Sequence, residues 1–308
     1  MKWHCLHGFL GRSQDWDLVL PRSLDSICYD LFSGQADPIP QSLLEWGRWV
    51  NLKASSVAQE GRPKDRIKAR GSENILLGYS LGGRIGLHAI LDEPDLWKVA
   101  VIVSAHPGLP ELGGPELAGG PRAAAPGPAA PGSRAEDRRV RLEADQKWAV
   151  RFKGVGGNEG VSGSVGSSTT WDALVHDWNS QPVFAAGGKP LPRNEADFSR
   201  SALATVMETC SLGVQRDLRA ELKNLKIPIL WIAGEHDTKF RTLAEEMAGL
   251  NPLFRERVIC GGNLGDGGGG EGVGHRVPWD NPGEFRDVLE EFCGSLVRDK
   301  SFVSSNAT

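Results

Sequence analysis

One pentapeptide constrains the fold of this chain more than any other feature. The segment Gly78–Gly82 reads GYSLG; a short apolar run precedes it and an apolar-faced helical pattern follows it. A G-x-S-x-G sequence between a strand and a helix is typical of a strained turn that exposes a serine hydroxyl. The alternative, an incidental serine in a glycine-rich turn, is weaker because Gly83 and the following helix also fit. We therefore interpret Ser80 as a reactive serine and the backbone N–H of Leu81 as an oxyanion donor.

The rest of the chain alternates short apolar runs with helix-length patterns. This alternation predicts βαβ units, and therefore an α/β fold with a mostly parallel sheet flanked by helices. The run Val99–Val103 is continuously apolar, as buried parallel strands are. The four clearest strands are expected at Asn74–Gly78, Val99–Ser104, Pro228–Ala233 and Arg257–Cys260.

A long stretch without strand character separates the second and third of these strands. Within it, Arg134–Phe152 and Ser199–Leu212 have helical patterns, which indicates a helical cap inserted between two strands. A final helix is expected to open at Pro282. The predicted division is a core of residues 1–108 and 213–298, a cap of residues 109–212, and a disordered tail of residues 299–308.

Four segments have compositions that are poor in core-forming residues. Glu60–Ser72 is charged and polar, Gly113–Gly132 is rich in Ala, Gly and Pro, and both Gly154–Ser168 and Gly261–Gly274 are rich in Gly. Such segments bury too little apolar surface to offset the entropy of ordering. We expect them to be mobile insertions in the fold.

Composition excludes several classes of function. The chain has 308 residues with 40% hydrophobic and 24% charged, as expected for one large globular domain or a domain with a cap. A net charge of −4 without any basic block argues against a nucleic-acid or polybasic membrane partner. No apolar run approaches the roughly 20 residues of a membrane span. The oligomeric state is left open.

Cysteine usage and the first residues predict the cellular setting. The five cysteines are scattered and form no C-x-x-C pair, which argues against a disulfide framework and against a zinc site. The segment Met1–Gly8 runs directly into a motif, so no signal or transit peptide is expected. We expect a reducing, cytoplasmic setting and no bound metal.

A serine hydroxyl needs a histidine to take its proton and a carboxylate to orient that histidine. In the chain order serine, acid, histidine, Asp237 is the preferred acid because it lies just past an apolar strand, and Glu235 is the rival. His275 is the predicted base, since it follows the last strand and its Gly-rich loop. Because loop-closure entropy grows slowly with length, that long loop need not abolish the geometry. His106, at another strand end, is expected to face the same site.

The segment His7–Gly11 reads HGFLG and comes just after the opening apolar residues. This is where the first oxyanion loop of the fold is expected, with the backbone N–H of Phe9 as the second donor beside that of Leu81. His7 itself is more often a structural loop histidine than a catalyst.

Several stretches together resemble the 2-succinyl-6-hydroxy-2,4-cyclohexadiene-1-carboxylate (SHCHC) synthases, the menaquinone-pathway members of the α/β hydrolases. The resemblance covers most of the chain outside the Gly-rich segments and implies the α/β-hydrolase fold. The loop Asp30–Gly34 departs from it, since many relatives have Asp-Leu-Pro-Gly-His-Gly there. The resembling stretches are Leu6–Gly11 with Asp15-Trp16, Gly78–Arg84, His106–Leu109, Trp148–Phe152, Asp177-Trp178, Gln181–Phe184, Ser211–Gln215 and Gly234–Phe240.

The resemblance implies a cofactor-independent carbon–oxygen lyase. Members of that family abstract a proton from a small-molecule polycarboxylate and eliminate pyruvate without an acyl-enzyme. Cationic side chains are expected around such a substrate, because guanidinium groups match carboxylates well. The family motifs place Tyr79, Arg84, Arg141 and Trp178 in the substrate pocket. A further arginine is expected, and the spacing does not decide between Arg193 and Arg200.

Two other functions stay open on the sequence. The same three side chains are able to serve a carboxylesterase or a C–C hydrolase that uses a covalent intermediate. A non-catalytic binding protein on the same fold is the third reading, against which the intact set of Ser80, Asp237 and His275 argues.

Overall fold

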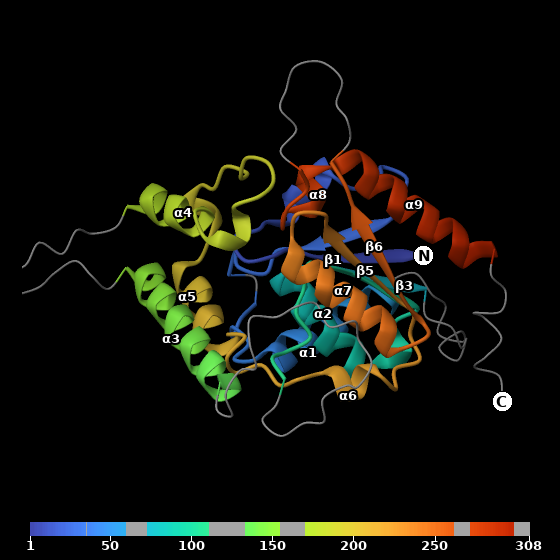
Figure 1. Ribbon diagram of the computed structural model, residues 1–308, viewed down its shortest axis with the longest axis horizontal. Coiled ribbons are helices and arrows are strands. Elements are labelled where there is room, and N and C mark those ends of the chain that lie inside the picture. Colours follow the sequence, from blue (N-terminus) through green and yellow to red (C-terminus); the bar gives the residue numbers. More distant parts are fainter. Residues whose placement is uncertain (35, 60–72, 111–132, 155–169, 262–271, 299–308) are drawn as a thin grey trace, which may run out of the picture.

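The computed structural model describes residues 1–34, 36–59, 73–110, 133–154, 170–261 and 272–298 (Figure 1). The predicted insertions Glu60–Ser72 and Gly113–Gly132 and the predicted tail 299–308 lie outside the described residues. So do all of Gly154–Ser168 except its first residue, and residues 262–271 of the segment Gly261–Gly274.

The centre of the described chain is a six-stranded sheet with the order β2-β1-β3-β4-β5-β6. Every neighbouring pair is parallel, which confirms the predicted α/β class and its mostly parallel sheet. The strands are β1 (Lys2–Leu6), β2 (Ser26–Tyr29), β3 (Asn74–Tyr79), β4 (Val99–Val103), β5 (Ile229–Gly234) and β6 (Phe254–Ile259).

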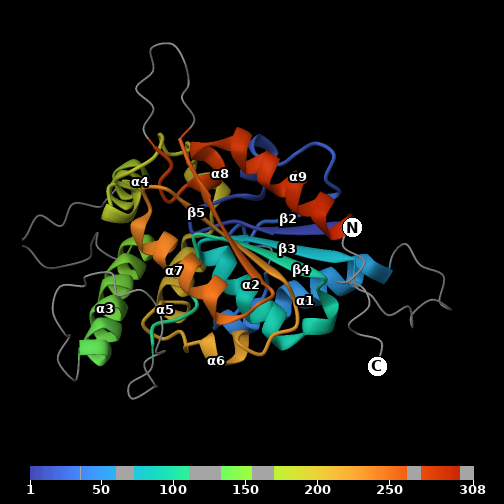
Figure 2. The same ribbon diagram turned by 45° about the vertical axis from the view of Figure 1, so that its right-hand side comes forward.

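Helices cover both faces of the sheet (Figure 2). On one face Leu76 and Ile102 belong to a core shared with α1 (Leu43–Gln59), α2 (Leu81–Asp92) and α7 (Thr238–Leu250). On the other face Leu77 and Val101 pack in a second core with α8 (Val277–Asp280) and α9 (Pro282–Arg298). Because successive side chains of a strand point to opposite faces, the continuous apolar runs supply both cores.

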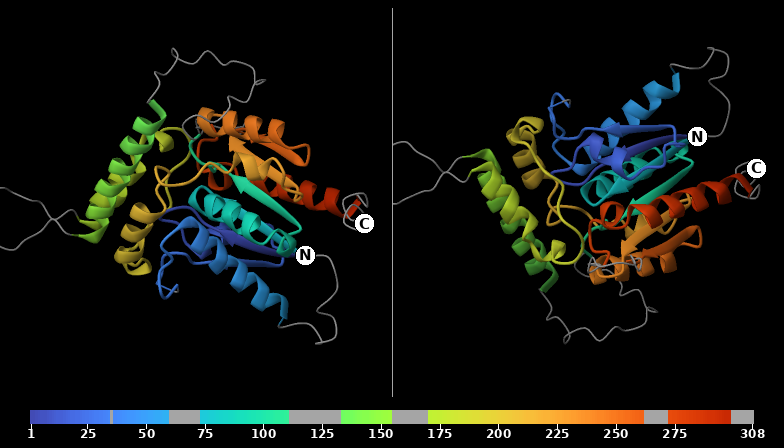
Figure 3. Two further views of the ribbon diagram at one scale, coloured as in Figure 1. Left: turned by 90° about the horizontal axis from the view of Figure 1, so that it is seen from below. Right: turned by 90° about the horizontal axis from the view of Figure 1, so that it is seen from above.

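Between β4 and β5 the chain forms α3 (Ser133–Lys153), α4 (Trp171–Asn179) and α5 (Arg200–Thr209), which lie together beside one end of the sheet (Figure 3). Polar residues begin two of these helices: Thr170 Oγ1 accepts the Ala173 N–H, and Ser199 Oγ accepts the Ala202 N–H. The exact division between core and cap that the sequence suggests remains a proposal.

The remaining helical segments are short. None of the helices within the described ranges is long and apolar enough to cross a membrane. The short segments are α6 (Arg219–Leu222) and the 3₁₀ turns Ser13–Leu18, Pro94–Leu96, Pro182–Phe184 and Glu195–Asp197.

Candidate active site

The turn from β3 into α2 holds Ser80 in a strained backbone conformation. Its φ of 52° and ψ of −114° lie in a region that residues with a side chain rarely adopt. The turn is also crowded: a Cβ on Gly82 would lie 2.3 Å from the carbonyl oxygen of Leu6, and one on Gly78 would lie 2.6 Å from that of Gly82. Glycine at both positions therefore lets the turn form, as the pentapeptide predicts.

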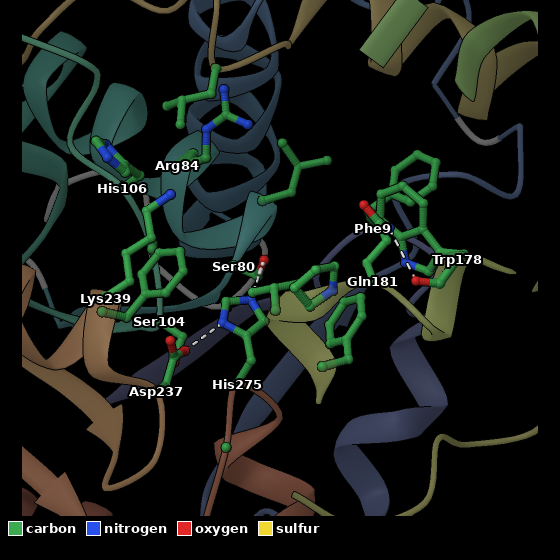
Figure 4. A pocket seen from close by; sticks show the side chains of 18 of the residues that line it. Phe9, Ser80, Arg84, Ser104, His106, Trp178, Gln181, Asp237, Lys239 and His275 are labelled. Atoms are coloured by element: carbon green, nitrogen blue, oxygen red, sulfur yellow. Dashed lines mark hydrogen bonds and ion pairs between the residues drawn. The ribbon is translucent and has the colours of Figure 1, made fainter. Parts of the chain in front are cut away.

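The structure brings Ser80, Asp237 and His275 together from three separate parts of the chain (Figure 4). His275 Nε2 lies 3.2 Å from Ser80 Oγ, and His275 Nδ1 lies 2.7 Å from Asp237 Oδ2. Asp237 and His275 are both buried. A hydroxyl, an imidazole and a carboxylate in this sequence are able to move a proton between the serine and the histidine.

Glu235, the rival acid, makes a different set of contacts. Its Oε1 accepts the backbone N–H of Gly261 at 2.5 Å and that of Val273 at 3.3 Å. These hydrogen bonds, the first above all, lower the pKa of its carboxyl group. Glu235 thus joins the two described ends that flank residues 262–271, and the His236 N–H fixes Val273 further by donating to its carbonyl at 2.9 Å.

The first predicted oxyanion loop lies next to the turn of Ser80. Phe9 and Leu81 both line the cavity that contains Ser80. His7 is buried and holds the loop from within: its Nε2 accepts the Leu31 N–H at 3.0 Å and its Nδ1 donates to the Gly8 carbonyl at 2.8 Å. The loop Asp30–Gly34, whose sequence differs from the family motif, is therefore joined to the HGFLG segment by the hydrogen bond from the Leu31 N–H to the His7 imidazole.

A cavity of about 490 Å³ lies over these side chains, between the sheet and the cap. Ser80, His275 and, from the first turn of α7, Lys239 line one side of it, and Trp178 of α4 lines it as well (Figure 4). Arg141 of α3 is a further lining residue. Its volume suits a small organic molecule.

Arg84 and Arg141, two of the predicted substrate residues, line this cavity. Arg84 Nε donates to Gln215 Oε1 at 2.6 Å and its Nη2 donates to the Cys210 carbonyl at 2.6 Å. Burial lowers the pKa of Arg84 to about 10. Arg141 Nε donates to Asp145 Oδ2 at 2.9 Å, as its position four residues earlier on the same helix allows.

Lys239 also lines the cavity, although it is not among the site residues that the sequence predicts. Within the described chain no carboxylate lies in ion-pair range of its ammonium group, which lies 5.5 Å from the centre of the Phe240 ring. Burial, followed by the positive charge of Arg141, lowers the pKa of Lys239. The signal was present in the motif Asp-Thr-Lys-Phe, where the lysine follows the acid by two positions.

His106 lines the same cavity, as its position at a strand end predicts. Its Nδ1 accepts the Gly108 N–H at 3.1 Å, so the neutral ring carries its proton on Nε2. Burial first, and then the charges of Lys239 and other cations, lower the pKa of His106 to about 2. His106 is therefore neutral at neutral pH. Its Nδ1 lone pair is already used by the Gly108 N–H, so this nitrogen cannot also accept a proton from a substrate.

Two further predicted pocket residues, Trp178 and Tyr79, both line a smaller side cavity, and only Trp178 also lines the cavity of Ser80. Trp178 lines the cavity and packs on Phe9 with 4.5 Å between ring centroids. The Tyr79 ring lies 5.6 Å from the His275 ring between centroids, and Tyr79 lines the side cavity of about 50 Å³, not the cavity of Ser80 as predicted. Burial raises the pKa of the Tyr79 hydroxyl.

The two alternative cap arginines are placed elsewhere. Arg193 forms a two-pronged ion pair with Asp15, at 3.0 and 2.8 Å, and lines the side cavity. Arg200 pairs with Glu195 at 2.5 Å and lies over the Trp171 ring. Neither lines the cavity of Ser80 in this structure.

No cluster of three or more His, Cys, Asp or Glu side chains suited to a metal ion occurs in the part of the chain that the structure describes.

Comparison with known proteins places these features in a family. The model of the alpha/beta hydrolase family matches residues 5–288. The 2-succinyl-6-hydroxy-2,4-cyclohexadiene-1-carboxylate synthase of Pectobacterium atrosepticum is 28% identical over 306 residues, 96% of this chain and 94% of that protein. The protein of the same name from Shigella sonnei is 33% identical over 253 residues, 79% of this chain and 80% of that protein. MenH from S. aureus has a similar solved structure, with a TM-score of 0.67 and 20% identity over 96% of this chain and 94% of that chain.

Proposed function

The chain belongs to the α/β hydrolase family and, within it, to the SHCHC synthases, and we propose that it is a carbon–oxygen lyase of menaquinone biosynthesis. Its substrate is then 2-succinyl-5-enolpyruvyl-6-hydroxy-3-cyclohexene-1-carboxylate, and its products are SHCHC and pyruvate. The reaction needs a base and an anion-binding pocket, and no redox or metal cofactor.

One observation carries this proposal: three cationic side chains line the cavity that contains Ser80. Arg84, Arg141 and Lys239 face a space of about 490 Å³. A substrate with several carboxylates matches this charge, because hydrogen bonds between ionised partners are stronger than neutral ones. The neutral ester substrates of a simple carboxylesterase have no such need of three cations.

The proposed step is a proton abstraction followed by elimination. Ser80 Oγ takes a proton from the substrate carbon next to the succinyl carbonyl, while the serine's own proton passes to His275 Nε2. Asp237 holds the other nitrogen, Nδ1, and stabilises the imidazolium that forms. The electron pair of the broken C–H bond then forms a new ring double bond, the existing ring double bond shifts by one position, and the C–O bond to the enolpyruvyl group breaks. The leaving enolate takes the proton from His275 on its carbon and becomes pyruvate.

Negative charge develops on the succinyl carbonyl oxygen as the proton leaves. The backbone N–H groups of Phe9 and Leu81 are the proposed donors to this oxygen. A preorganised pair of donors lowers the barrier because it needs no rearrangement when the charge appears.

The test is to mix purified protein with the enolpyruvyl precursor and to follow pyruvate with a coupled dehydrogenase. We expect release that Ser80→Ala lowers at least ~1000-fold in kcat, while Asp172→Asn, on the exposed surface of α4, leaves it unchanged. Pyruvate release at the background rate, with a rapid burst of product from simple aryl esters, would instead favour a covalent esterase.

A further inference from the structure

Asp280, the last residue of α8, joins two segments that are far apart in the sequence. Its Oδ1 accepts the backbone N–H of Gly188 at 2.8 Å, and its Oδ2 accepts that of Gly274 at 2.9 Å. Gly188 follows the 3₁₀ turn Pro182–Phe184 of the cap region, and Gly274 directly precedes His275. One carboxylate thus uses each oxygen for a different segment.

The two segments also touch each other directly. A Cβ on Gly274 would lie 2.1 Å from the carbonyl oxygen of Ala186, and a Cβ on Gly187 would lie 2.3 Å from Asp280 Oδ2. Gly187 has a φ of 101°, which favours glycine. The backbones therefore pack closely here, with the carboxylate beside them.

Both segments contribute to the candidate active site. Ala185 and Ala186 line the cavity of Ser80, and the Phe184 ring lies 5.6 Å from that of His275 between centroids. A shift of the segment 185–188 would therefore change the cavity wall and the surroundings of the imidazole together.

From these contacts we propose that Asp280 is a positioning residue, which holds the segment 185–188 and the loop of His275 in one fixed relation. Its effect on turnover rests on the proposed function. Glu235 fixes only the loop, because its single oxygen Oε1 accepts both Gly261 and Val273. Asp280 alone of these two carboxylates reaches across to the segment 185–188.

The charges around Asp280 suit this role. Arg276 and His275 face it, and both favour its ionised form, as do its two backbone hydrogen bonds. Burial acts in the opposite direction and is the largest influence, so the pKa of Asp280 is raised. The carboxylate is half-buried, and its negative charge contributes to the raised pKa of the Tyr79 hydroxyl.

The experiment compares Asp280→Asn with Asp287→Asn, the same substitution at an exposed position on α9. An asparagine has one acceptor oxygen, so it no longer links the N–H groups of Gly188 and Gly274, and both segments lose the constraint that the link provides. We expect amide hydrogen exchange about tenfold faster in peptides covering both 185–188 and 272–276. We also expect kcat for pyruvate release to fall at least ~tenfold while KM rises no more than about threefold. Asp287→Asn should change neither quantity.

Gly187→Ala approaches the same contact from the other segment, since its Cβ would displace the Asp280 carboxylate. It should accelerate exchange in the same two peptides. Exchange that stays at the wild-type rate in either peptide of Asp280→Asn, or faster exchange with unchanged kcat, would overturn the proposal. If the wild-type protein releases no pyruvate, the proposed function fails by itself. The exchange rates, together with the rate at which a fluorophosphonate labels Ser80, then decide the role of Asp280.

Discussion

Asp237 Oδ2 lies 2.7 Å from His275 Nδ1, although the two residues are 38 positions apart and come from the ends of different strands. Asp237 lies in the loop after β5, and His275 lies after β6, between that strand and α8. The carboxyl ends of parallel strands meet at one edge of a sheet, which is why residues this distant form a single site.

Asp237→Asn is expected to lower kcat by about 1000-fold or more, because an amide no longer holds the imidazole in the required tautomer. Glu235→Gln is the matched comparison, since its remaining carbonyl oxygen still accepts both the Gly261 and the Val273 N–H. Its kcat should stay within about threefold of the wild-type value. Pyruvate release measures both variants, and a larger loss for Glu235→Gln than for Asp237→Asn would assign the acid role to Glu235.

Ser80→Gly is expected to stabilise the fold while abolishing turnover. The strained φ of 52° costs a residue with a side chain on the order of 1–3 kcal/mol, and glycine avoids this cost. After the entropy that glycine loses on folding, the free energy of unfolding should rise by about 1 kcal/mol. Urea titration measures it, with Ser80→Ala as the control that keeps the strain. Equal stabilities of the glycine and alanine variants would show that the turn stores no strain.

Lys239 is expected to set the alkaline limit of substrate binding. Its pKa is lowered, so its ammonium group loses its proton at a lower pH than an ordinary lysine. As the pH rises through that lowered pKa, one cation of the cavity disappears and KM should rise by about tenfold. Lys239→Arg should move this rise in KM to higher pH, because guanidinium stays protonated. A KM profile that is the same in both proteins would remove Lys239 from anion binding.

Buried neutral histidines should make the fold acid-sensitive. The pKa values of His4 and His88 are lowered to about 4, and that of His106 to about 2, with burial as the first cause in each. Below pH ~6.5 the unfolded chain binds protons that the folded chain excludes, so stability is complete above that pH and falls as the pH drops. Each histidine contributes a loss of up to ~1.4 kcal/mol per pH unit.

His88→Leu isolates one of these contributions. Within the described chain neither ring nitrogen of His88 has a hydrogen-bond partner, so the substitution removes no such contact. The slope of unfolding free energy between pH 6 and 5 should fall by about 1 kcal/mol per pH unit. The exposed His176 provides the control, as His176→Asn should leave the slope as it is. Identical slopes for His88→Leu and the wild type would refute the assignment.

The sequence predicted the parallel sheet and most of its strands because buried strands read as continuous apolar runs. The predicted strand before Ser80 ends at Gly78, one residue before the end of β3. The predicted last strand begins at Arg257, three residues after β6 begins at Phe254. Three consecutive charged residues, Arg255–Arg257, hide the first half of β6 from an apolar-run pattern, since its central residues are exposed. Strand β2 escaped prediction because four residues offer little periodicity.

The candidate site was predictable where chemistry imposes a local motif, and unpredictable where it depends on the cap. Ser80 has a required turn, and Asp237 has a required place after a strand. Arg193 and Arg200 have no such local rule, and in the structure they pair with Asp15 and Glu195. Contacts between residues so far apart follow from the packing of the cap, which spacing along the chain does not encode.

The chain leaves the sheet after β4, forms the cap, and returns as β5, the strand that pairs directly with β4. This excursion from the sheet, the segment between β4 and β5, thus begins and ends at neighbouring strands of the same sheet. The excursion can therefore differ between related proteins while the order of the strands and the positions of Ser80, Asp237 and His275 stay the same. Arg141 and Trp178 of the cavity wall lie on this excursion, whereas Arg84, Lys239, Ser80 and His275 lie outside it, so a change in the excursion alters only one part of the wall.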